Sequence, residues 1–170
     1  MTDRNDFTPE EWERLGRAPL VAGMAISLAD PGGPIEALKE TNAALRTVLD
    51  AARSGDHGEF VRDAASDVAE KAKHHHNPLS GFKPGDGGKD PREGILDELR
   101  AVNALLVEKA TPEETEQFRE WLKAAAQASA LAAKEGGFLG FHAQRVSEGE
   151  QQMLERLGEV FSDPADAAAD

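Results

Sequence analysis

Apolar positions in this chain repeat with the spacing of α-helices. In one such stripe the residues are four, three and four positions apart: Ile95, Leu99, Val102 and Leu106. This spacing places the residues on a single helical face. Similar stripes of apolar or small residues recur at 38–52, 61–72, 118–132 and 153–160. No segment alternates apolar and polar residues as a strand does, so the pattern predicts an all-α protein.

Helix starts are marked by capping boxes, in which a Ser or Thr side chain and a Glu three residues later bond each other's backbone N–H groups. The pairs that fit are Thr8 with Glu11, Thr111 with Glu114, and Ser147 with Glu150. Asp90 precedes Pro91 and forms an Asp-capped start of the same kind. Phe7 and Trp12 stand at the two positions of a hydrophobic staple around the first start.

These signals predict a compact bundle of six to seven helices, folded as a single helical domain over residues 1–170. The predicted helices are 8–17, 19–29, 34–53, 57–75, 91–109, 112–135 and 148–161. Pro19 is expected to break the first helix from the second. Residues 77–90, rich in Gly and Pro, are expected to form a flexible linker between two helical halves, and residues 162–170 a frayed tail.

The two halves share an order of features that suggests two pseudo-repeated helical hairpins. Each begins with Thr-Pro-Glu-Glu, continues as an Ala-rich helix and breaks at two adjacent glycines. A shift of 103 residues places Ala22 on Ala125 and Gly33 on Gly136. The other interpretation is that two unrelated hairpins use the same start and stop chemistry.

Charge and composition exclude several functions. The chain of 170 residues carries 32 acidic and 19 basic side chains, a net charge of −13, without runs of Lys or Arg. Such a surface repels nucleic-acid phosphates and anionic lipids. The longest apolar run, 19–29, is shorter than the roughly 20 residues that a membrane span needs. With no Cys and no signal-peptide pattern, the chain is expected to be cytoplasmic, without nucleic-acid partners or membrane spans.

Three consecutive histidines, residues 74–76, are the first candidates for metal ligands. Neighbouring residues on a helix point about 100° apart, so the three cannot share one ion. Glu70 and His74 are four residues apart and can face one ligand, which makes them weak metal candidates. The alternative is a helix C-terminus, where imidazoles suit the helix dipole. We therefore predict no metal site as the main interpretation.

Catalytic motifs are missing from the sequence. There is no Glu-x-x-His and no Gly-x-Ser-x-Gly. The Gly-rich stretch ending at Lys89 has Lys83 where a phosphate-binding loop needs Gly, and Asp90 where it needs Ser or Thr. The sequence predicts a protein that is not an enzyme and needs no cofactor.

The most unusual stretch follows the Ala-rich helix that ends near Gly136. It places three large apolar residues, Phe138, Leu139 and Phe141, in an expected loop. Loops are normally polar and lie on the surface. These residues are candidates for partner binding. The interpretation that the sequence favours is nevertheless a plug over the end of the core, and a third possibility is the wall of a small-ligand pocket.

The stretch from this helix to the next start resembles TerB-like domains, helical domains tied to tellurite resistance and bacterial stress. The residues that carry the resemblance are Glu135 with Gly136, and Ser147 with Glu150. The family usually has Asp where this chain has Glu135. The resemblance implies a non-catalytic acidic adaptor in a stress system.

Together these observations predict a non-enzymatic, acidic interaction or scaffold protein. It would use an apolar patch to hold a protein partner or a second copy of itself as a homo-oligomer. The alternative function is a helical module that binds a metal ion or a small apolar ligand.

Overall fold

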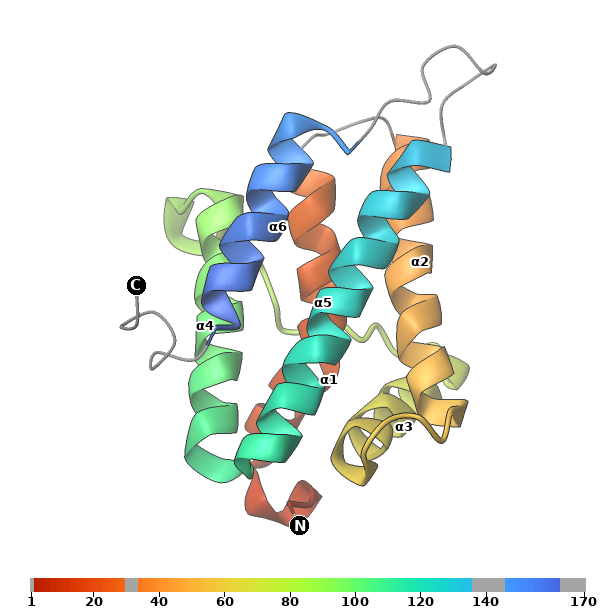
Figure 1. The fold of residues 1–170 in the computed structure, drawn as a ribbon, viewed down its shortest axis with the longest axis vertical. Helices are drawn as coiled ribbons and strands as arrows, with labels where there is room; N and C mark the ends of the chain where they lie inside the picture. The colour runs from red at the N-terminus through yellow and green to blue at the C-terminus, as the bar shows by residue number, and fades with distance from the viewer. Residues whose placement is uncertain (1, 30–33, 136–145, 163–170) are drawn as a thin grey trace.

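The computed structural model describes residues 2–29, 34–135 and 146–162, and within these ranges the chain forms six α-helices and no strands (Figure 1). The predicted all-α class is confirmed. The helices are α1 (Pro9–Ala29), α2 (Pro34–Arg53), α3 (Glu59–Lys73), α4 (Pro91–Lys109), α5 (Pro112–Glu135) and α6 (Glu148–Val160). Two short 3-10 turns, η1 (Arg4–Asp6) and η2 (Asp86–Gly88), precede α1 and α4. None of the helices in the described ranges has an apolar stretch sufficient for crossing a bilayer.

The predicted capping boxes are confirmed. The Thr8 N–H donates to Glu11 Oε2 at 2.7 Å, and the Glu11 N–H donates back to Thr8 Oγ1 at 3.3 Å. Ser147 and Glu150 make the same reciprocal pair at 3.1 and 2.8 Å. The staple also forms, because the Phe7 and Trp12 ring centroids lie 5.8 Å apart. Local sequence therefore determines where these helices begin.

The predicted helix break at Pro19 is wrong, because α1 continues through this residue as one helix. Pro19 has no N–H to donate to the carbonyl four residues earlier, which costs about 3 kcal/mol in an exposed helix. Here the helix is buried over residues 18–23, without interruption. The apolar contacts of this central segment offset the lost hydrogen bond.

Helix α1 is the centre of the bundle and packs against all five other helices. In Figure 1 it lies behind α5, with α4 and α6 on one side and α2 on the other. Helix α3 crosses the lower end of α2. The two predicted halves thus share one core, and the predicted pseudo-repeat is not confirmed.

The core has an aromatic region formed by residues from the N-terminal segment and from α1, α3 and α5. Ring centroids follow one another at 5.2–6.1 Å through Phe7, Trp12, Phe60, Phe118 and Trp121. All five residues are buried. Rings at these separations attract one another beyond the effect of area burial. The chain has few aromatic residues, but five of them form one continuous cluster in the core.

Elsewhere in the core, small residues let the helices approach closely. Gly23 of α1 is buried where α1, α2 and α5 meet. A Cβ atom on Gly23 would lie 2.7 Å from both Ala44 Cβ and Ser129 Oγ. The Ala-rich stripes seen in the sequence thus serve helix–helix packing.

Candidate functional site

The predicted metal candidates Glu70 and His74 lie at the exposed C-terminal end of α3. Glu70 forms an ion pair with Lys73. The hydrogen bond from Lys73, with a smaller contribution from His74, lowers the pKa of Glu70 below its usual value. In the described part of the chain, no three His, Asp or Glu side chains come together as metal ligands would. Glu70 thus has a local cationic partner in Lys73.

The histidines end α3 with a Schellman turn. The His75 N–H donates to the Ala72 carbonyl at 3.1 Å, and the His76 N–H donates to the Lys71 carbonyl at 3.0 Å. Such a turn requires a left-handed residue, usually Gly, and here His75 occupies it with φ of 56°. This turn sends the chain back over α1 as the connection 77–90.

The connection 77–90 packs on the bundle at two points. Leu79 and Phe82 are half-buried against the core. A Cβ atom on Gly94 of α4 would lie 1.8 Å from the Pro84 carbonyl oxygen, so the absence of a side chain at Gly94 lets the connection approach this helix. Its predicted flexibility stays a prediction, but its course over α1 and α4 creates a hollow on each side of Arg17.

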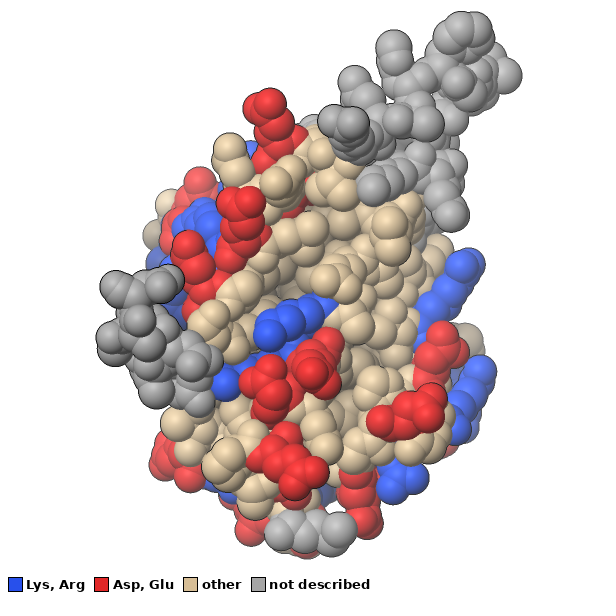
Figure 2. All heavy atoms as spheres, in the orientation of Figure 1, with Lys and Arg blue, Asp and Glu red and all other residues tan. Residues whose placement is uncertain are grey.

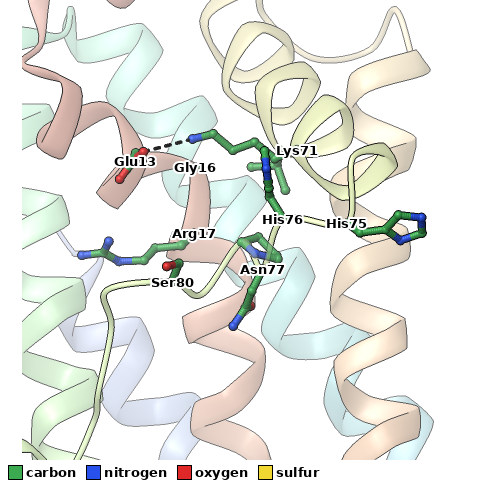
Figure 3. Close-up of a pocket in the computed structure, with 10 residues that line it drawn as sticks. Glu13, Gly16, Arg17, Lys71, His75, His76, Asn77 and Ser80 are labelled. Atoms are coloured by element: carbon green, nitrogen blue, oxygen red, sulfur yellow. Dashed lines mark ion pairs between the residues drawn. The ribbon is translucent and has the colours of Figure 1, made fainter.

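The first hollow, of about 350 Å³, lies between α1 and the end of α3. Figure 3 shows Lys71 reaching across it toward Glu13, at 3.6 Å, while Asp67 also pairs with Lys71, at 3.1 Å. His76 and Asn77 complete its rim. The positive charge of Lys71 is already paired with Glu13 and Asp67, so this hollow has no marked excess of positive or negative charge.

The second hollow, of about 640 Å³, lies between α1, α4 and the connection. At its base Glu98 is buried and accepts from two guanidinium groups, at 3.2 Å from Arg14 Nε and 2.6 Å from Arg17 Nη2. Arg17 also stacks near the Phe82 ring, 5.9 Å from its centroid. In Figure 3, Arg17 extends from α1 away from His75. Two cations here share one buried carboxylate.

The rim of this hollow carries further charges. Asp97 accepts from Lys89 at 2.5 Å and from Arg100 at 2.8 Å. Their hydrogen bonds, Lys89 first, lower the pKa of Asp97 below its usual value. The negative charge of Asp97 is thus neutralised by Lys89 and Arg100.

A different surface lies on the C-terminal half of α5. Residues 124–133 contain no charged side chain, although 30% of the chain is charged. We call its outward residues Ala124, Gln127, Ala128 and Leu131 the uncharged α5 face. Leu131 is 57% exposed. Figure 2 shows tan surface over this half of α5, with acidic side chains along α6 beside it.

The predicted partner-binding residues Phe138, Leu139 and Phe141 lie outside the described residues. They follow α5 directly in sequence. Sequence reasoning missed Leu131, whose signal was a large apolar residue at an outward position of a charge-free stretch. It also missed Arg14, Arg17 and Glu98, which no local pattern connects.

Comparison of the chain with family models, with curated proteins and with solved structures finds no match. The resemblance to TerB-like domains therefore stays a prediction.

Proposed function

We propose that this protein is a non-catalytic interaction module that binds a protein partner through the uncharged α5 face. The observation that carries the proposal is the exposure of Leu131 within the charge-free segment 124–133 of α5 on an acidic protein. A single exposed Leu is common on protein surfaces. Leu131 follows seven uncharged residues of α5, and the first charged residues after it are Lys134 and Glu135, so its apolar surroundings make it a better candidate for burial by a partner.

The energetics favour such a contact. Burying a Leu side chain contributes about 1.5–3 kcal/mol. The small side chains of Ala124 and Ala128 lie on the same helical face as Leu131, seven and three residues before it. Their size lets a partner helix approach α5 closely.

Charge complementarity identifies the partner's chemistry. Glu148, Glu155 and Glu159 are exposed on α6, the helix that flanks this face. We infer a partner with an apolar face bordered by Lys or Arg. A second copy of this chain would bring another net charge of −13, which disfavours self-association.

The predicted contacts Phe138, Leu139 and Phe141 belong to the same proposal, as a continuation of the α5 face along the sequence. The resemblance to TerB-like domains supports an adaptor role in a bacterial stress system. This role and the cytoplasmic location stay predictions from the sequence.

Site-specific photocrosslinking in the native host tests the proposal. A photoreactive phenylalanine analogue replaces Leu131 in one variant and Val107 in another. Val107 is a matched control, because it is 56% exposed but lies beside Glu108 on α4. We expect a discrete protein adduct from position 131 and none from position 107.

Three results would overturn the proposal. They are no adduct from position 131, the same adducts from both positions, or an adduct from position 131 with twice the mass of the chain. The last would show self-association in place of a different partner.

A further inference from the structure

The second hollow contains an excess of positive charge at its base. Arg14 and Arg17 both donate to the same oxygen, Glu98 Oε1. Two guanidinium groups and one carboxylate leave one unmatched positive charge. Arg17 and Glu98 are largely buried, with side chains 11% and 10% exposed, whereas Arg14 is 37% exposed and presents the excess charge at the mouth of the hollow.

Hydrogen-bond donors also remain at this place. Arg14 uses only its Nε, and Arg17 only its Nε and Nη2, in hydrogen bonds within the described part of the chain. Within the described ranges, the terminal nitrogens of Arg14 and the Nη1 of Arg17 donate to no protein acceptor. Guanidinium donors of this kind match the paired oxygens of carboxylate and phosphate.

Arg14, Arg17 and Glu98 form a charged triad, and its surroundings suit a small ligand. Both arginines line the hollow, whose volume of about 640 Å³ falls within the common range for ligand sites, roughly 300–1,000 Å³. The half-buried Phe82 ring forms an apolar wall. Lys83 of the connection adds an exposed cation that makes no ion pair within the described residues. Of the two other carboxylates that line the hollow, Asp97 is already bound by Lys89 and Arg100, and Asp86 is exposed on the connection, so four cations face three carboxylates in the lining.

We propose that the second hollow binds an oxyanion ligand, a carboxylate or a phosphate group. Arg14 and Arg17 hold the anion, Lys83 contributes charge at the rim, and Phe82 contacts any apolar part of the ligand. The site shares no residue with the uncharged α5 face, so a negative result for one proposal does not affect the other.

A purely structural role for the triad is the opposing interpretation. Glu98 joins α4 to two positions on α1, and this tie alone would account for its burial. The two interpretations differ for Arg14→Gln. Because Arg14 is 37% exposed, this variant should fold, and it leaves Arg17 and Glu98 as a neutral pair. The variant removes the excess charge and the guanidinium donors of Arg14, and it keeps the Arg17–Glu98 ion pair that joins α1 to α4.

NMR titration of the full chain at neutral pH tests the proposal, with sodium phosphate and sodium succinate as probes and sodium chloride at matched ionic strength as the control. We expect saturable shifts in the Arg14 and Arg17 side-chain N–H signals and the Lys83 and Gly94 amides. A dissociation constant on the order of 1 mM is expected for so small a ligand. Saturation by phosphate alone, succinate alone or both supports the proposal and identifies the anion.

The variants complete the test. Arg14→Gln should weaken binding about tenfold or more, because it removes charge-assisted hydrogen bonds. Arg46→Gln, which removes an exposed cation from α2, a helix that supplies no residue to the lining of this hollow, should bind as the wild-type chain does. Shifts by chloride equal to those by phosphate and succinate, or equal weakening in both variants, would overturn the proposal. Absence of saturable shifts with either probe would do the same and leave the triad a structural tie.

Discussion

His75 adopts a backbone conformation that usually belongs to glycine. Its φ of 56° places Cβ close to its own carbonyl oxygen, while the neighbouring His74 has an ordinary φ of −89°. The two hydrogen bonds of the Schellman turn, donated by the His75 and His76 N–H groups, keep His75 in this strained conformation. The strained residue lies where α3 ends and the connection 77–90 begins.

His75→Gly should therefore raise the free energy of unfolding by about 1 kcal/mol, because glycine accepts the left-handed conformation without strain. His74→Gly is the matched control and should lower it by roughly 0.5–1 kcal/mol through backbone entropy. Urea unfolding measures both. A loss of stability in His75→Gly would show that the imidazole makes a stabilising contact.

Glu114 connects two ends of the fold. Its carboxylate accepts from the Thr111 N–H at 3.0 Å and from the Thr2 N–H at 2.9 Å. Burial raises the pKa of Glu114, but the hydrogen bonds from Thr2 and Thr111 outweigh this effect and lower the pKa to about 2. The N-terminal segment is thus tied to the start of α5.

A depressed pKa in the folded state stabilises the protein above the unfolded value of 4.5, and the stabilisation is lost as the pH falls toward about 2. Glu114→Gln should cost about 1 kcal/mol at pH 7, as expected for a capping group. The difference from wild type should shrink between pH 5 and pH 3 in urea unfolding. Glu113→Gln, which removes a neighbouring exposed carboxylate, should not reproduce this change. A pH-independent difference for Glu114→Gln would refute the assignment.

At the scale of the elements, helix starts could be predicted because caps are local. Thr8 and Ser147 each meet their Glu partner three residues later, so the sequence contains both halves of the signal. Pro19 misled the prediction because packing between helices outweighs a local preference. The triad could not be predicted, because Glu98 is 84 residues from Arg14 and 81 from Arg17.

The connection 77–90 depends on one glycine of α4. Gly94→Ala should push Pro84 away, since the added Cβ would lie 1.8 Å from its carbonyl oxygen. Trypsin should then cut faster after Lys89 than in wild type, whereas the Lys83–Pro84 bond is resistant to trypsin. Gly158→Ala is the control, because nothing lies within 4 Å of a Cβ there. It should leave cleavage unchanged and add up to about 1 kcal/mol of stability. Equal cleavage in Gly94→Ala and wild type would show that the connection does not rest on α4.

At the scale of the whole molecule, one central helix organises a core shared by both halves of the chain. The caps fix the helix ends, the aromatic region and the small residues fix their packing, and acidic side chains dominate the surface. Against this background two surfaces differ, the uncharged α5 face and the cationic hollow at Arg14 and Arg17. Charge pattern thus separates the proposed protein-binding surface from the proposed anion site.

The most direct test of the central claim is the dissociation constant of the purified crosslinked partner for four chains, measured by calorimetry. The chains are wild type, Leu131→Asp, Val107→Asp and Arg14→Gln, each first shown to unfold at the wild-type temperature. We predict weakening of about tenfold or more for Leu131→Asp, because the buried Leu contributes at least about 1.5 kcal/mol. Val107→Asp and Arg14→Gln should stay within about twofold. Wild-type affinity in Leu131→Asp, or an equal loss in Val107→Asp, would contradict the claim that the α5 face is the binding surface.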